Sequence, residues 1–145
     1  MTVYRHLLVA VEIHDSGKQI LQRAQALAES FDAHLSIVHV VEYLPVDPAG
    51  DALLTTPVDL SGERAEQARE QLGAYCDELD IPRSQLRVVV GAVTGEILRL
   101  QKELVADLIV IGHHPRSGLS ALFSHTDDGV LTRACCDVLA LNLDC

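Results

Sequence analysis

Five short apolar runs, rich in Val, Ile and Leu, alternate along the chain with segments of helical periodicity. Nearly continuous apolar runs are typical of strands that are buried on both faces of a sheet. Strands that alternate with helices pair in parallel through right-handed crossovers. The sequence therefore predicts an α/β fold: a single doubly wound domain over residues 1–145, with a five-stranded parallel sheet and helices on both faces. The predicted strands are 3–11, 34–42, 86–90, 107–111 and 137–143.

Four helices are predicted between these strands. They are expected to begin at the capping pair Asp15 and Ser16, at Ser61 or Gly62, at a Thr94 cap, and at Asp127. The stretch 43–60 carries three prolines and a glycine, which predicts a loop longer than compact domains usually contain. Its role stays open between a lid and a merely exposed connection.

The charge of the chain restricts its partners. Eleven Lys and Arg against 21 Asp and Glu give a net charge of −10. Such a chain repels phosphate backbones and anionic lipid, so we expect it to bind neither nucleic acid nor a membrane surface. No apolar run approaches the roughly 18 residues of a membrane span. The four cysteines form no CxxC pair, and reduced thiols in the cytoplasm are the expected state.

Several common ligand-binding and catalytic motifs are absent from the sequence. It contains no P-loop, no GxGxxG after the first strand, no GxSxG and no HExxH. In an open α/β sheet, ligands bind beyond the carboxyl ends of the strands, where the strand order reverses. The positions to examine are therefore 12–16, 40–42, 91–95 and 112–128. No pair of residues there stands out as a general acid and base, which counts against a small-molecule enzyme.

The stretch from Gly112 to Thr126 is the most informative of these. A strand ends in Gly112, and a polar loop leads into a helix whose free N–H groups would suit an anion, with Arg116 and Thr126 as helpers. The alternative is a tight turn at Gly112 and a helix cap at Thr126 or Asp127. The local residues favour the cap, because the acidic start of this helix would repel a phosphate.

Over essentially its whole length the chain resembles the universal stress protein family. The resemblance lies in YRHLLVAVE at 4–12, IVHV at 37–40 and ADLIVIGHH at 106–114. The doublet His113-His114 and the ending DVLAL at 137–141 are most similar to the universal stress protein A subgroup. The resemblance implies a cytoplasmic stress-response protein that forms a homodimer through its last strand. Leu139, Leu141 and Leu143 alternate on one side of that strand and are the predicted interface residues.

Many members of this family bind ATP through Gly, two residues, Gly, nine residues, then Gly and Ser or Thr. Laid on this chain, the pattern keeps Gly112 and Thr126, but Pro115 and His125 stand where the other glycines belong. Proline has no N–H to donate, and histidine adds bulk where the backbone should approach phosphate. At the base end, Glu12 stands in place of the usual aspartate and Val40 matches the apolar position. The expected cofactor is therefore none.

Two functions remain as hypotheses. The first is a homodimeric, non-catalytic binding or signalling module that acts through unidentified protein partners. The alternative is a nucleotide-dependent switch that binds ATP with Mg²⁺, with slow hydrolysis or autophosphorylation. Its residues would be Glu12, Val40, Gly112, His114, Arg116 and Thr126. A metal site at His113, His114 and His125 lacks recognisable ligand spacing and is not expected.

Overall fold

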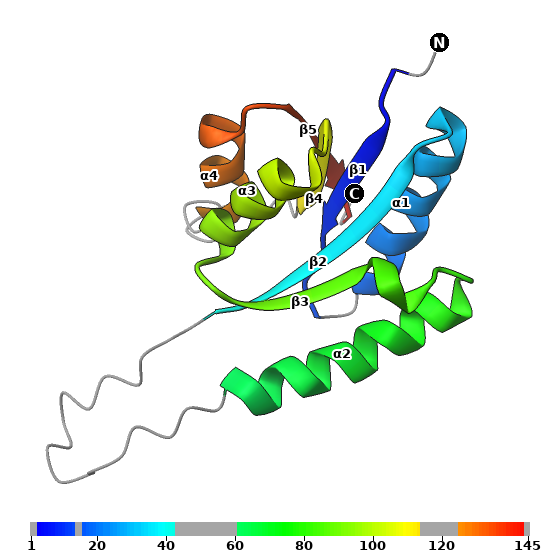
Figure 1. Cartoon of the computed structure of the whole chain (residues 1–145), viewed down its shortest axis with the longest axis vertical. Coiled ribbons are helices and arrows are strands. Elements are labelled where there is room, and N and C mark those ends of the chain that lie inside the picture. Colours follow the sequence, from blue (N-terminus) through cyan, green and yellow to red (C-terminus); the bar gives the residue numbers. More distant parts are fainter. Residues whose placement is uncertain (1–2, 14–15, 43–60, 114–124, 144–145) are drawn as a thin grey trace, which may run out of the picture.

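Five parallel strands form one sheet in the order β3-β2-β1-β4-β5 (Figure 1). The structure is a computed structural model, and it describes residues 3–13, 16–42, 61–113 and 125–143, without the side chains of 125–128. The strands are β1 (His6–Ala10), β2 (His34–Glu42), β3 (Leu86–Gly91), β4 (Leu108–His113) and β5 (Asp137–Asn142). The predicted parallel sheet is confirmed, and β5 lies at its edge.

Helices cover both faces of the sheet, as predicted (Figure 1). The helices α1 (Gly17–Phe31) and α2 (Ser61–Glu78) pack on one face, and α3 (Val93–Leu104) and α4 (His125–Arg133) pack on the other. A short 3-10 helix, η1 (Arg83–Gln85), leads into β3. Within the described residues, no helix is both long enough and apolar enough to span a bilayer.

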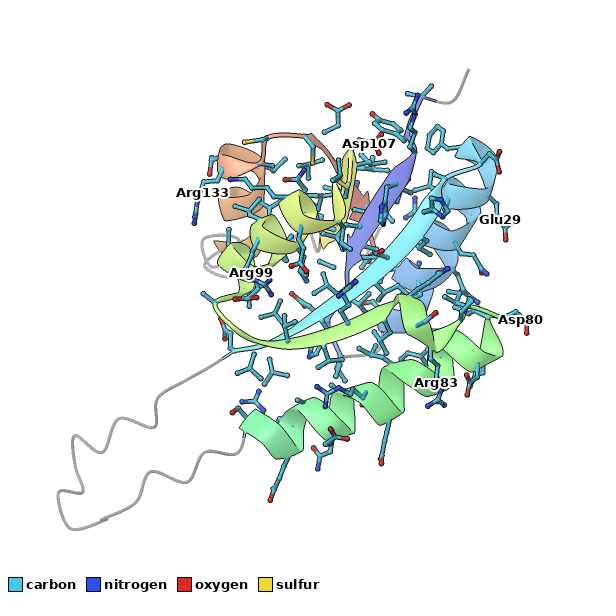
Figure 2. All side chains as sticks on the ribbon, in the orientation of Figure 1. Glu29, Asp80, Arg83, Arg99, Asp107 and Arg133 are labelled. Carbon is cyan, nitrogen blue, oxygen red and sulfur yellow. The ribbon has the colours of Figure 1, made fainter. Side chains whose placement is uncertain are left out.

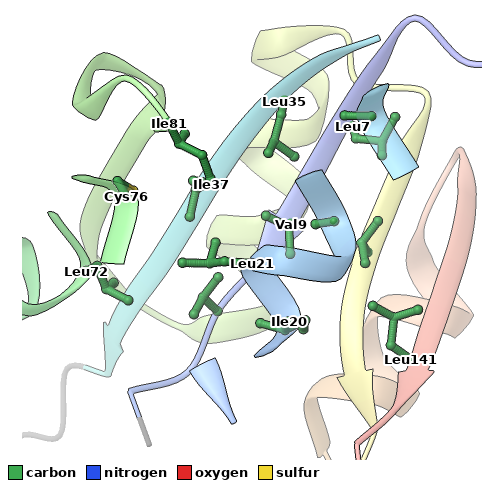
Figure 3. Close-up of a cluster of buried hydrophobic side chains, with 14 of the residues drawn as sticks. Leu7, Val9, Ile20, Leu21, Leu35, Ile37, Leu72, Cys76, Ile81 and Leu141 are labelled. Atoms are coloured by element: carbon green, nitrogen blue, oxygen red, sulfur yellow. The ribbon is translucent and has the colours of Figure 1, made fainter. Parts of the chain in front are cut away.

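Alternate residues of the strands supply two separate cores. Leu7 and Val9 of β1 pack under α1 and α2, whereas Leu8 between them packs under α3 and α4. All three are fully buried, and each such side chain contributes about 1.5–3 kcal/mol when it is buried completely. Figure 3 shows the first core, in which Ile20 and Leu21 of α1 meet the sheet. This alternation explains why the strand sequences are apolar throughout.

Element boundaries and helix caps differ from the predictions in places, and several strand ends shift by one or two residues. Strand β1 begins at His6 rather than at residue 3, and Val3 is 70% exposed. Ser16 occupies the N-cap of α1 as predicted, but its side chain makes no capping hydrogen bond. The N-cap of α3 is Ala92, so the prediction of a Thr94 cap was wrong. Helix α4 begins at His125, two residues before the expected start. Asp15 and the stretch 43–60 lie outside the described residues.

Candidate functional site

A crevice of about 280 Å³ opens beyond the carboxyl ends of β1, β2 and β4. The strand order reverses between β1 and β4, because β1 connects through α1 to β2 on one side while β4 lies on the other. This is the position at which open parallel sheets bind ligands. The lining residues used below are Val11, Glu12, Gly17, Val38, His39, Val40, Glu42, Arg64, Val93, Ile97, Ile111, Gly112 and Leu143.

The floor of the crevice is apolar. Val38 from β2, Ile97 from α3 and Ile111 from β4 are buried, and the half-buried Val40 and Val93 extend the same surface. Three separate elements thus meet in a surface that suits the flat apolar part of a small ligand.

The rim of the crevice is mainly acidic. Glu12 follows β1 and Glu42 ends β2, whereas Arg64 of α2 is the one Lys or Arg in the described lining. Two carboxylates and one guanidinium give the described part of the lining a net charge of −1. Such a rim repels a highly charged anion and tolerates a neutral or weakly charged one.

His39 adds an oriented polar group to the lining. Its Nδ1 lies 2.7 Å from the carbonyl oxygen of Val11. Because a carbonyl only accepts, Nδ1 carries the hydrogen of this bond, and Nε2 is the acceptor of the neutral ring. His39 and Arg64 were both missed by the sequence reasoning. A histidine between valines at the end of a predicted strand was a usable signal, whereas Arg64 lay among other charged residues of a predicted wet helix face.

Two glycines let the backbone close around this crevice. A Cβ on Gly17 would lie 2.8 Å from the carbonyl oxygen of Glu12, so the start of α1 sits directly against the chain that follows β1. A Cβ on Gly112 would lie 2.8 Å from Cδ1 of Leu143 and 3.2 Å from Cδ1 of Ile20. Gly112 therefore has a packing role here, whatever it does toward a ligand.

Only some of the residues predicted to contact a ligand lie in the parts of the chain that the structure describes. Glu12 after β1, Val40 of β2 and Gly112 of β4 all line the crevice. His114 and Arg116 lie outside the described residues, as does Pro115 between them. Thr126 belongs to α4, but its side chain is not described. The described residues contain no group of three or more His, Cys, Asp and Glu that would hold a metal ion.

The residues predicted for the dimer interface lie at the end of the chain. Leu139 and Leu141 belong to β5 and Leu143 follows it; all three pack toward the α1 side of the sheet. Leu141 is only 5% exposed, so its side chain is taken up by the core of its own chain. What β5 presents at the open edge of the sheet is its backbone.

One hydrogen bond shows which N–H and C=O groups of β5 point toward β4 and which point toward the open edge. The N–H of Leu143 donates to the carbonyl of His113 at 3.1 Å, so this residue faces β4. Residues alternate along a parallel strand, and the N–H and C=O groups of Val138, Ala140 and Asn142 therefore face the open edge. Nη1 of Arg23 in α1 donates to the outward carbonyl of Asn142 at 3.1 Å, which leaves the earlier part of the edge for pairing.

Together, the sheet order and the crevice at its switch point define an open, doubly wound α/β protein of the kind that binds a small ligand beyond its strands. The comparison with known families is more specific: the universal stress protein family matches residues 3–142. The chain belongs to the universal stress protein family, as the sequence resemblance predicted.

Individual relatives are similar to the chain in sequence, and solved structures are similar to it in fold. The chain is 32% identical over 138 residues to universal stress protein A homolog 1 of Coxiella burnetii, covering 95% of this chain and 96% of that protein. It shares its fold with UspA from Lactobacillus plantarum, at a TM-score of 0.65 and 23% identity over 95% of this chain and 97% of the other. A universal stress protein in complex with cAMP matches at a TM-score of 0.61 and 21% identity, over 97% and 98% of the two chains.

Proposed function

We propose that this universal stress protein is a homodimeric, non-catalytic binding or signalling module of the cytoplasm that does not hold ATP tightly. The observation that carries the proposal is the acidic rim of the crevice, whose described lining holds Glu12 and Glu42 but, of the Lys and Arg residues, Arg64 alone. Its output would pass through protein partners that bind the dimer.

The rim and the sequence beside it both disfavour a triphosphate. ATP brings several negative charges, and the carboxylates of Glu12 and Glu42 repel each of them. Pro115 offers no backbone N–H where the family motif has a glycine, and His125 stands at the other lost glycine. Lost backbone donors are costly to replace, because a phosphate oxygen without a partner has given up its water.

The alternative is an ATP-dependent switch, and one observation favours it. Glu12, Val40 and Gly112 gather at one crevice with an apolar floor, which is the arrangement that the family resemblance implies for the base and the first phosphate. In this alternative Arg116 and Thr126 would hold the phosphates with Mg²⁺, and His114 would line the pocket. The relative that is in complex with cAMP carries a ligand with one phosphate, which the rim would oppose less than three.

Thermal unfolding with and without nucleotide separates the two functions. A ligand at 100 times its Kd stabilises the folded state by about 2.7 kcal/mol. The proposal predicts no rise in Tm with millimolar ATP and Mg²⁺, and no release of phosphate over a long incubation. A clear rise in Tm that Thr126→Val removes would support the switch instead.

The homodimer is proposed to form by antiparallel pairing of two β5 edges. The outward N–H and C=O groups of Val138 and Ala140 lie at the open edge, where they can form hydrogen bonds with a strand of another chain. Two copies paired in this way would be related by a two-fold axis.

A proline at the open edge tests this pairing without disturbing the sheet. Ala140 is exposed and its N–H faces outward, so Ala140→Pro removes a donor to the partner but none to β4. Light scattering should give the mass of a dimer for the native chain and for Ala140→Ser, which keeps the N–H, and the mass of a monomer for Ala140→Pro. A dimeric, folded Ala140→Pro would move the interface elsewhere.

A further inference from the structure

A polar surface lies at the amino-terminal ends of β1, β2 and β3, at the opposite end of the sheet from the crevice. Leu8 and Val38 pack into the core under α3, and alternate residues of a strand share a face. In the strand register His6 lies opposite His34, Leu8 opposite Ser36, and Val38 opposite Arg87. Four polar residues therefore share the α3 side of the sheet, and we name them the amino-end shelf: His6, His34, Ser36 and Arg87.

The shelf is open, and His6 lies against both Ser36 and His34. Nε2 of His6 lies 2.7 Å from Oγ of Ser36, and both residues are half-buried. The rings of His6 and His34 lie edge to face with their centroids 6.0 Å apart. His34 and Arg87 are exposed to solvent. The surface thus presents a hydroxyl and two imidazoles together, with the guanidinium residue Arg87 on the neighbouring strand opposite Val38.

Arg87 is one of several cations that form no ion pair within the described parts of this acidic chain. Lys18, Arg69, Arg83 and Arg99 each form an ion pair with a carboxylate. Arg87 forms no ion pair or hydrogen bond with any residue in the described parts of the chain. A guanidinium offers a planar set of donors that matches an oxyanion, and here that set is unused within the chain.

The pKa of His6 depends on the other groups of the shelf as well as on burial. Burial lowers the pKa of the His6 imidazole, and the neighbouring His34 and Arg87 lower it further. The carboxylate of Asp107 and the backbone carbonyl of Leu104 act in the opposite direction without reversing the shift. That carboxylate already accepts the backbone N–H groups of Arg5 and His6, near the start of β1 (Figure 2).

We propose that the amino-end shelf binds a tetrahedral oxyanion of the sulfate and phosphate class. Arg87 supplies the charge, and the Ser36 hydroxyl and the His34 ring supply further hydrogen bonds. Because a protonated His6 imidazole attracts the anion, binding strengthens as the pH falls into the range, below that of an ordinary histidine, in which His6 gains its proton. This site is independent of the crevice and of the proposed function, since it lies at the other end of the strands.

Nuclear magnetic resonance of the histidine rings in the full chain tests the site, with sulfate as the probe. Sulfate keeps its two charges across the titration, so any pH dependence belongs to the protein. Replacing chloride by sulfate at equal ionic strength should raise the pKa of His6 by about half a unit, a threefold change in its protonation equilibrium. The chemical shifts of the backbone amides of Ser36 and Arg87 should change with sulfate concentration and reach a plateau.

Two variants make the result decisive. Arg87→Gln should abolish the response to sulfate, whereas Arg133→Gln, an exposed arginine on α4 (Figure 2), should leave it intact. Amide signals away from the shelf report whether each variant is folded. An equal pKa of His6 in the two salts, or a full response in folded Arg87→Gln, would overturn the proposal.

Discussion

A Cβ atom on Gly112 would lie 2.8 Å from Cδ1 of Leu143, the residue that follows β5. Gly112 is also the first glycine of the family's ATP-binding pattern, so its presence alone does not indicate a bound nucleotide. In this chain the missing side chain lets the end of β4 pack against the last leucine beside the crevice.

Gly112→Ala is therefore expected to destabilise the fold. Overpacking a filled site typically costs 1–3 kcal/mol, and we expect about 1 kcal/mol here because the Leu143 methyl is able to shift. Urea unfolding measures the loss. In a Leu143→Ala background the same substitution should cost less, because the contact is gone. Equal losses in both backgrounds would show that this contact is not the reason for the glycine.

Gly17→Ala should be more damaging, because the atom in the way is backbone. The new Cβ would lie 2.8 Å from the carbonyl oxygen of Glu12, which moves only with the chain. We expect a loss of about 2 kcal/mol in the free energy of unfolding. Gly95→Ala in α3 is the matched control, since its nearest neighbour would be 3.9 Å away and alanine favours a helix by about 1 kcal/mol. If Gly17→Ala left the free energy of unfolding unchanged, the close contact with the Glu12 carbonyl would be refuted.

Asp107 is expected to stabilise the fold in a pH-dependent way. Burial raises the pKa of its carboxyl, but the N–H groups of His6 and Arg5 lower it by more, so the pKa lies below the ordinary 3.8. A carboxyl whose pKa is lowered by folding adds stability above its unfolded pKa, and this stability is lost as the pH falls through the folded value.

The variant Asp107→Asn measures this contribution. It should lower the free energy of unfolding by about 1–2 kcal/mol at neutral pH, since hydrogen bonds to a charged acceptor are lost. The difference from the native chain should shrink in strong acid, where the native carboxyl is protonated as well. Glu70→Gln, on the exposed side of α2, should change little at either pH. A loss that is the same at both pH values would argue against a charged Asp107.

The sequence predicted the sheet and its helices because their signals are local. Apolar runs such as Leu7 to Val11, and the helical spacing of Ile20 and Ala24, reflect burial that each element needs wherever it packs. The N-cap of α3 was misplaced because Thr94 is a good capping residue, whereas the fold uses Ala92. There the packing of α3 on the sheet overrides a local preference of the side chain.

The sequence predicted only those crevice residues whose positions follow from the carboxyl ends of the strands. Glu12, Val40 and Gly112 were expected near one another because the carboxyl ends of parallel strands meet at one edge. Arg64 was not expected, since its place depends on how α2 lies across β2 and β3, which no local pattern encodes. The same holds for the amino-end shelf, where Arg87 and Ser36 are 51 positions apart in the sequence and come to neighbouring strands only through the sheet register.

Calorimetric titration of the native chain with ATP and Mg²⁺ tests the central claim most directly, namely that this crevice does not hold ATP tightly. The account predicts no saturable heat up to about 1 mM ATP, which corresponds to a binding free energy weaker than about −4.1 kcal/mol. A saturable isotherm within that range, with one ATP per chain, would contradict it.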